Sequence, residues 1–317
     1  MYISQAFKIQ HDFWRYVVGT MVVIGVNLLG QFPFLIAILL KGDDSVLSMG
    51  NDPTAVLNIL DKNTTLFFIL LPFALSLIAL FFIVKFLHKQ SITSLTTSRK
   101  KIDWKRVFFA FGLWTIITII TIGADYYSSP ENYQLNFKLV PFLILALIAF
   151  IFIPMQTSVE EYIFRGYLMQ GIGTLTKNKW LPLVITSFTF GMLHIANPEV
   201  DKLGYIILVY YIGTGFFLGI LTLMDEGMEL ALGFHAANNL ISALLVTADW
   251  TAFQTHSVFK DISEPTAGFD VLIPILIVYP ILLFIFAKKY KWSDWKEKLF
   301  GKVTPPTTTV IEEIGVQ

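Results

Sequence analysis

The sequence predicts an all-α membrane protein, a multi-pass transmembrane helical bundle of about eight helices with a cavity at membrane depth. Of the 317 residues, 55% are hydrophobic and only 15% are charged, whereas a soluble domain has roughly 25% charged residues. The apolar residues stand in long blocks, as in a chain that crosses a bilayer several times. Three polar interruptions in these blocks carry glutamate, arginine, histidine and asparagine, and they predict the cavity.

Nine apolar segments follow one another along the chain, and a spanning helix needs about 20 such residues. Seven are clear candidates for crossings: Val17–Leu40, Leu66–Leu87, Val107–Ile122, Leu139–Ile153, Gly204–Met224, Leu230–Thr247 and Val271–Ala287. Two are shorter or more polar, Ser158–Ile172 and Leu181–His194, and we expect at least one to be a partial helix that lines a cavity. Residues 1–300 are expected to form one polytopic domain, followed by a flexible tail, 301–317.

The distribution of charge predicts that both termini lie on the cytoplasmic side. The linker 85–106 holds seven basic residues and one acidic residue, and the segment after Ala287 holds six lysines. The connection after the first helix is instead acidic, with Asp43, Asp44, Asp52 and Asp61. Because Lys and Arg favour the cytoplasmic face, the number of crossings should be even. We expect an integral protein of a bacterial plasma membrane.

Overall charge and the lack of cysteine narrow the possible functions. The net charge is zero, so no nucleic-acid partner is expected; the expected surroundings are the lipid bilayer. The chain has no cysteine, which excludes disulfides, thiolate zinc sites and cysteine nucleophiles. Six tryptophans near segment ends are expected at the membrane interfaces: Trp104, Trp114, Trp180, Trp250, Trp292 and Trp295.

The stretch PMQTSVEEYIFRGYLMQ, residues 154–170, places three charges between apolar blocks. A structural interpretation is available for the two glutamates. Pro154 would break the preceding helix, and Thr157 or Ser158 would cap the next one. Glu160 or Glu161, three residues after these caps, would complete a capping box. This interpretation leaves the arginine of the stretch unexplained.

The spacing of the charges favours a functional interpretation. Glu161 and Arg165 are four residues apart, share a helix face and are expected to pair. Glu160 points about 100° away from that face and has no local partner. A central charge costs about 2.5–3.5 kcal/mol on insertion scales, so an ionisable residue at this depth indicates function. We therefore predict that Glu160 is a general base.

Two of the five histidines, His194 and His235, lie inside apolar blocks. Phe190 precedes the first by one helical turn, and Asn239 follows the second by one turn. Either histidine alone is more often a hydrogen-bonded structural residue. Together with the glutamates and the arginine, they supply what a hydrolytic site needs. A base activates water, an imidazole orients the water or binds a metal, and an amide with a second imidazole stabilises an oxyanion.

These three motifs, in this order, resemble the CPBP family of intramembrane proteases. That family includes the type II CAAX prenyl endopeptidases and the bacterial Abi and bacteriocin-immunity proteins. The motifs read Glu-Glu-x-x-x-Arg at 160–165, Phe-x-x-x-His at 190–194 and His-x-x-x-Asn at 235–239. The resemblance covers residues 140–250 and implies that the catalytic core lies there.

The resemblance implies a role for each motif residue. The implied catalytic set is Glu160, Glu161, Arg165, His194, His235 and Asn239. The first glutamate activates water with help from the first histidine. The second glutamate and the arginine brace the helix or hold substrate, and the second histidine and the asparagine donate to the oxyanion. Because the family is commonly called metalloprotease, a divalent metal such as zinc on Glu160, His194 and His235 stays open beside a metal-free mechanism.

The implied activity is that of an intramembrane endopeptidase with water as the nucleophile. Its substrate would be a peptide or a membrane protein. One branch of the family implies a lipidated, CAAX-type C-terminus, and leader-peptide processing is a second possibility. The residues alone leave an alternative, a multi-pass transporter or a non-catalytic membrane scaffold that uses the same polar residues to bind a proton or an ion. Gly215 and Gly219, four residues apart, predict close packing between helices.

Overall fold

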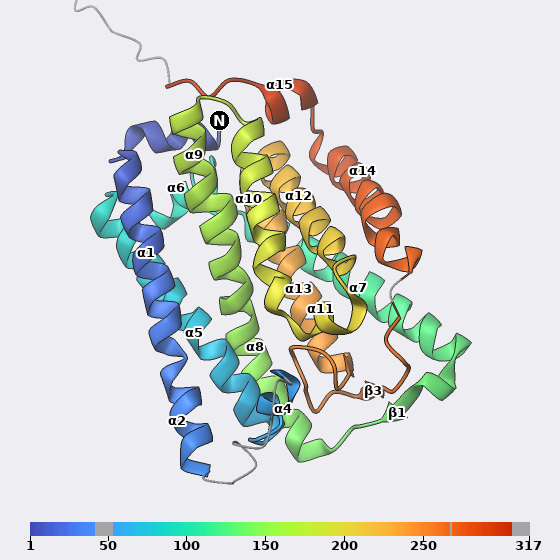
Figure 1. Cartoon of the computed structure of the whole chain (residues 1–317). Coiled ribbons are helices and arrows are strands. Elements are labelled where there is room, and N and C mark those ends of the chain that lie inside the picture. Colours follow the sequence, from blue (N-terminus) through green and yellow to red (C-terminus); the bar gives the residue numbers. More distant parts are fainter. Residues whose placement is uncertain (42–52, 267, 306–317) are drawn as a thin grey trace, which may run out of the picture.

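The computed structural model confirms the all-α bundle and describes residues 1–41, 53–266 and 268–305 (Figure 1). Among these residues, five helices are long and apolar enough to cross a membrane: Phe13–Lys41, Lys62–Leu87, Trp104–Ser128, Leu139–Thr176 and Ile207–Asp225. The helix Trp180–Ala196 is apolar but shorter. Asp43, Asp44 and Asp52 of the predicted acidic connection lie outside the described residues.

The helices follow the predicted apolar segments closely. Those of the first half are η1 (Ile3–Lys8), α1 (Phe13–Gly30), α2 (Phe32–Lys41), α4 (Pro53–Leu57), α5 (Lys62–Phe82), η2 (Ile83–Leu87), α6 (Ile92–Thr96) and α7 (Trp104–Ser128). Those of the second half are η3 (Pro130–Asn132), α8 (Leu139–Glu161), η4 (Tyr162–Leu168), α9 (Met169–Thr176), α10 (Trp180–Met192), η5 (Leu193–Ala196), α11 (Pro198–Leu203), α12 (Ile207–Asp225), α13 (Glu229–Leu245), η6 (Phe269–Leu272), η7 (Pro274–Val278), α14 (Tyr279–Tyr290) and α15 (Trp295–Phe300).

Three short strands form a small sheet at one end of the bundle. They are β1 (Tyr133–Leu135), β2 (Val246–Thr247) and β3 (Phe259–Asp261), in the order β1-β3-β2. The outer strand β1 runs antiparallel to β3, with Leu135 opposite Phe259. The other outer strand, β2, runs parallel to β3, with Val246 opposite the same phenylalanine. The sheet joins the loops that follow α7 and α13.

The predicted helix break at Pro154 is wrong. Residues Leu139–Thr176 form one continuous helix of 38 residues, so the predicted segments Leu139–Ile153 and Ser158–Ile172 belong to a single candidate span. Thr157 is not a helix cap, since its Oγ1 donates to the Ile153 carbonyl 3.1 Å away inside α8. A membrane helix tolerates a proline because neighbouring groups satisfy the freed carbonyl. The nine predicted segments therefore become eight.

The irregular part of the long helix lies one residue after the second glutamate. It is η4, a π-helical turn over Tyr162–Leu168 that carries Arg165. Such turns interrupt the usual pattern of helical hydrogen bonds and are frequent at functional sites. The polar stretch therefore changes the helix geometry without ending the helix.

At least one of two segments was expected to be a partial helix, and the short helix is found at the second of them, Leu181–His194. Helix α10 has 13 residues and gives way to the 3₁₀ turn η5, which carries His194. Thirteen residues span only about 20 Å, less than the roughly 30 Å of a hydrocarbon core. The helix therefore ends inside the bundle, where η5 holds His194. The chain then runs back through α11 and α12 to the end of the bundle that holds Glu226 and α15.

The two described chain ends and the basic linker gather at one end of the bundle (Figure 1). Glu226, just after α12, pairs there with Lys298 of α15 and lies 3.9 Å from the N-terminal amine. The backbone N–H of Val303 donates to the Lys177 carbonyl at 2.9 Å, so residues 301–303 of the predicted tail are held to the fold. Residues 306–317 lie outside the described part. The assignment of this end to the cytoplasm stays a prediction.

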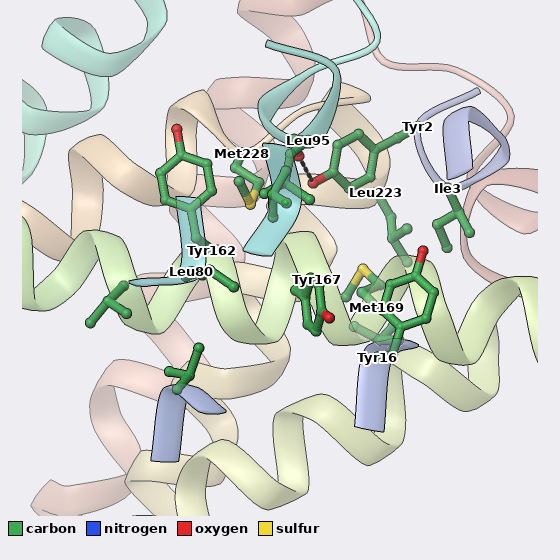
Figure 2. Packing of buried hydrophobic residues seen from close by; sticks show 14 of the residues in the cluster. Tyr2, Ile3, Tyr16, Leu80, Leu95, Tyr162, Tyr167, Met169, Leu223 and Met228 are labelled. Carbon is green, nitrogen blue, oxygen red and sulfur yellow. Dashed lines mark hydrogen bonds between the residues drawn. The ribbon is translucent and has the colours of Figure 1, made fainter. Parts of the chain in front are cut away.

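The N-terminal turn η1 packs against α9, and Tyr2, which precedes it, reaches the irregular part of the long helix (Figure 2). Tyr2 is buried, and its hydroxyl lies 2.6 Å from the Leu95 carbonyl and 3.2 Å from the Arg165 carbonyl. Tyr162 and Met228 belong to the same apolar cluster. The cluster fixes η4, and with it the position from which the Arg165 side chain enters the bundle.

The glycine pair of α12 lets two helices approach closely, as predicted. A Cβ atom on Gly215 would lie 2.6 Å from the Ser187 carbonyl oxygen of α10, closer than real contacts allow. One on Gly219 would lie 2.4 Å from a Leu183 methyl group of the same helix. The absence of side chains here brings the α12 backbone within reach of groups on η4.

Candidate active site

The six predicted site residues come from four elements that meet in the middle of the bundle. Glu160 and Glu161 end α8, Arg165 lies in η4, His194 lies in η5, and His235 and Asn239 lie one turn apart on α13. Side chains from α8, η4 and α13 contact one another directly. The fourth element is the turn η5, which directly follows the partial helix α10.

Glu161 and Arg165 form the buried pair that their spacing predicts. One oxygen of Glu161, Oε1, accepts from Arg165 Nη1 at 3.1 Å and from His235 Nδ1 at 2.7 Å. Arg165 Nη2 donates to the Gly215 carbonyl at 3.1 Å, and the guanidinium lies 4.3 Å from the centre of the Phe190 ring. Both charged side chains are fully buried. The pair therefore connects α8 and η4 with α12 and α13.

Glu160 is the glutamate without an arginine. Its Oε1 accepts from Gln156 Nε2 at 2.5 Å. Its Oε2 is buried and has no hydrogen-bond partner, and it lies 3.5 Å from His235 Nε2. The imidazole of His235 consequently stands between two carboxylates, with one ring nitrogen directed toward each.

His194 reaches the site from another direction. Its Nδ1 donates to the Phe190 carbonyl at 2.8 Å, which leaves the lone pair of the neutral ring on Nε2. The ring stacks on Tyr211, with centres 4.2 Å apart. The Phe190 ring contacts both imidazoles, at 5.0 Å from His194 and 5.9 Å from His235.

The arrangement does not match the three-ligand metal site on Glu160, His194 and His235. Within the described residues, no three His, Asp or Glu side chains are grouped so that they could hold a metal ion. His235 directs both ring nitrogens at glutamates, and the Phe190 ring contacts both histidines. The steps proposed below therefore use protein groups and water alone.

A cavity of about 800 Å³ opens beside these residues. Glu160, His194 and Asn239 are on its wall. Three other wall residues are largely exposed at the surface of the bundle: Ile24 (54%), Leu28 (60%) and Leu193 (65%). Ile24 and Leu28 belong to α1, and Leu193 begins η5, directly after α10. Helices α1 and α10 stand on either side of the long α8–α9 helix in Figure 1. The cavity therefore reaches the apolar outer surface of the bundle between α1 and the end of α10.

Four residues that sequence reasoning did not assign to the site take part in it. Gln156 bonds Glu160, Asn238 donates to Asn239 at 3.0 Å, and Glu199 lines the cavity. The sequence could have indicated a role for Gln156, because it precedes Glu160 by one helical turn and shares its helix face. Trp114 was expected at a membrane interface, and that prediction is wrong. Its indole N–H donates to Asn238 Oδ1 at 3.1 Å, so the ring lies within the bundle.

Comparisons with known proteins agree with the motifs. The family described as type II CAAX prenyl endopeptidase Rce1-like matches residues 138–241, which include all six predicted site residues. YyaK, an uncharacterized protein of Bacillus subtilis (strain 168), is 31% identical over 245 residues, covering 74% of this chain and 78% of that relative. No solved structure matches the chain.

Proposed function

Because this chain belongs to the Rce1-like family of type II CAAX prenyl endopeptidases, we propose that it hydrolyses a peptide bond of a membrane-bound substrate with water activated by Glu160. One observation carries the proposal. A carboxylate oxygen of Glu160 is buried without a hydrogen-bond partner beside a large cavity whose wall also holds His194 and Asn239. A buried polar atom without a partner is costly, so such an atom calls for a ligand or a water molecule.

The reaction begins with a water molecule in the cavity. Oε2 of Glu160 takes a proton from this water, and the oxygen forms a bond to the carbonyl carbon of the substrate. The neutral His194 presents Nε2 to the cavity and orients the water by accepting its other proton in a hydrogen bond. The proton held by Glu160 then passes to the leaving nitrogen as the C–N bond breaks. The products are a peptide with a new carboxyl group and a fragment with a new amino group.

Asn239 and His235 have different tasks in this proposal. Asn239 lines the cavity and uses one N–H of its amide for Gln156, which leaves the second N–H for the developing oxyanion. His235 was expected to donate to the same oxyanion, but its two nitrogens face the glutamates. We assign it to positioning Glu160 during the reaction, because the Nε2 lone pair can accept a hydrogen bond from Oε2 once that oxygen carries the proton taken from water.

The buried ion pair of Glu161 and Arg165 organises the site without facing the cavity. The guanidinium is anchored by the Gly215 carbonyl, and the carboxylate orients His235 through Nδ1. A histidine whose one nitrogen is fixed by a carboxylate has a defined tautomer and ring orientation. The pair therefore acts through His235 and is a positioning element.

The cavity also supports a substrate class. Apolar residues of α1 and α5 line much of its wall, including Ile24, Leu28, Ile69 and Phe73. Because it reaches the apolar side of the bundle, a substrate with a lipid chain or a hydrophobic segment can enter from the bilayer. We propose a prenylated CAAX-type C-terminus as the first class to test, and hydrophobic leader peptides as the second.

A peptide panel tests the function. The protein in liposomes is incubated with a farnesylated CAAX peptide, its unprenylated form and a form whose scissile amide is N-methylated. Mass spectrometry should show a new C-terminus from the first peptide and none from the blocked one. If none of these peptides is cleaved, a hydrophobic leader peptide is not cleaved either, and an imposed proton or ion gradient dissipates instead, the transporter alternative replaces this proposal.

A further inference from the structure

A continuous line of hydrogen bonds runs from an indole on α7 to the carboxylate of Glu160. Trp114 Nε1 donates to Asn238 Oδ1 at 3.1 Å, and Asn238 Nδ2 donates to Asn239 Oδ1 at 3.0 Å. Asn239 Nδ2 donates to Gln156 Oε1 at 3.0 Å, and Gln156 Nε2 donates to Glu160 Oε1 at 2.5 Å. Three side-chain amides thus link the donor at one end with the acceptor at the other.

The chemistry of the two ends fixes the direction of every amide between them. An indole N–H can only donate, and an ionised carboxylate can only accept. The oxygen and nitrogen of an Asn or Gln amide are otherwise interchangeable in shape. If the three amides were reversed, an NH₂ group would face the indole N–H of Trp114, and a carbonyl oxygen would face the carboxylate of Glu160. Only the observed direction satisfies all four contacts.

This direction has a consequence for the two oxygens of Glu160. Oε1 is occupied as an acceptor by Gln156, while Oε2 is buried without a hydrogen-bond partner. A proton on Oε1 would be directed at the NH₂ group of Gln156. A proton taken from water therefore goes to Oε2, the oxygen near His235 Nε2. The same line of bonds fixes which edge of the Asn239 amide carries N–H groups.

We propose that Trp114, Asn238 and Gln156 are positioning residues that make Oε2 of Glu160 the proton acceptor and hold the Asn239 amide with its N–H groups toward the site. This proposal rests on the proposed peptidase function for its effect on rate, but not for the existence of the coupled bonds. The three residues belong to α7, α13 and α8. The line therefore also ties the position of α7 to the site.

Kinetics test the effect of these residues on the reaction. Gln156→Leu and Asn238→Leu should each lower kcat roughly 100-fold, as a small misplacement of a catalytic group does, with KM little changed. Trp114→Phe removes only the last donor and should lower kcat about fivefold, the factor that one ordinary hydrogen bond is worth. Ser187→Ala, which removes a buried hydroxyl outside the line of bonds, is the matched control.

Two further readouts separate a coupled line from general damage. The double variant Gln156→Leu/Asn238→Leu should lose no more activity than the worse single variant, since neighbours in one network are not additive. In tryptophan-¹⁵N-labelled protein, Gln156→Leu should move the Trp114 indole N–H signal, and Ser187→Ala should not. Additive losses, or an unmoved indole signal in Gln156→Leu, would overturn the proposal. If the wild type cleaves no peptide, the function fails, and the indole signal still decides the hydrogen-bond line.

Discussion

Two clusters of charged side chains, each built on buried acids, differ in how completely they are paired. The end cluster consists of Arg99, Arg106, Asp225 and Glu229, beside the described chain termini. The cavity cluster consists of Glu160, Glu161, Arg165 and His235, at mid-depth. Both contain two acids, but the end cluster has two arginines, whereas the cavity cluster has one arginine and a histidine.

Every carboxylate oxygen of the end cluster has a partner. Asp225 Oδ2 accepts from Arg99 at 2.8 Å, and its Oδ1 accepts from Trp292 at 3.1 Å and from Arg106. Glu229 Oε2 accepts from Arg99 at 3.0 Å, and its Oε1 accepts from the Asp103 backbone at 3.2 Å. This network ties the basic linker to the turn between α12 and α13.

The cavity cluster leaves three buried atoms without hydrogen-bond partners: Glu160 Oε2, Glu161 Oε2 and Arg165 Nε. A charge in the bundle interior is costly unless it is paired and hydrogen-bonded. The fully paired cluster stabilises the fold, while the incompletely paired cluster borders a cavity into which water and substrate can come. The comparison teaches that missing partners, more than the number of charges, mark the site.

The largest expected effect comes from removing Glu161, the acid that Arg165 and His235 share. Glu161→Gln leaves Arg165 as a buried cation without an acid, and it should lower the free energy of unfolding by about 3 kcal/mol. Peptide cleavage should be lost as well, because His235 loses the carboxylate that orients it. Thermal unfolding in detergent and the cleavage assay measure the two losses.

A double variant serves as the control for this change. In Glu161→Gln/Arg165→Met no buried cation remains, so most of the stability should return while cleavage stays absent. If the single variant is as stable as the wild type, the pair does not hold the site together.

A smaller loss is expected in the end cluster. Arg99→Met removes a partner of both Asp225 and Glu229, but Arg106 still pairs with the aspartate. Stability should fall by about 2 kcal/mol, below the range for a fully buried pair. The folded fraction, isolated by size exclusion, should keep the wild-type kcat. The exposed Lys101 of the same linker offers the matched variant Lys101→Met, with little effect on either quantity.

The smallest effect concerns Glu199, which lines the cavity outside both clusters. Its Oε1 accepts from the Ala252 N–H at 2.9 Å, and its Oε2 is buried without a partner. Burial raises the pKa of Glu199 above its ordinary value. Because the folded protein holds this proton more tightly than the unfolded chain does, the group favours folding at low pH and opposes it as the pH rises through the folded pKa.

Glu199→Gln should therefore raise the stability by about 1 kcal/mol at pH 8, since it removes a carboxylate that is costly to keep unpaired. The gain should shrink as the pH is lowered from 8 toward 5, because the raised pKa brings protonation of the wild-type carboxyl at a higher pH than usual. Unfolding temperatures of both proteins across this pH range measure it. A constant difference at all pH values would show that ionisation of Glu199 is not the cause.

The sequence allowed the fold class and the gathering of the motif residues to be predicted, because both depend on hydrophobic blocks and on helical spacing. The pairing of Glu161 with Arg165 follows from a four-residue spacing within one helix. The partial helix that ends near His194 was likewise visible in its short apolar run.

Long-range contacts could not be predicted in this way. Pro154 is a break signal in isolation, but the surrounding helices keep α8 continuous through it. No spacing rule connects Trp114 with Asn238, which are 124 positions apart and meet because α7 packs on α13. The same limit applies to the place of His235 between the two glutamates, which depends on how α13 lies against α8.

The most direct test of the central claim compares wild-type protein with Glu160→Gln on the farnesylated CAAX peptide. Both proteins should bind the peptide equally and unfold at similar temperatures. Turnover should fall roughly 100- to 10,000-fold in the variant, the contribution expected of a general base. In H₂¹⁸O the wild-type product should carry one ¹⁸O in its new carboxylate. Equal turnover by the two proteins would contradict the account, because the water would then be activated by a group other than Glu160.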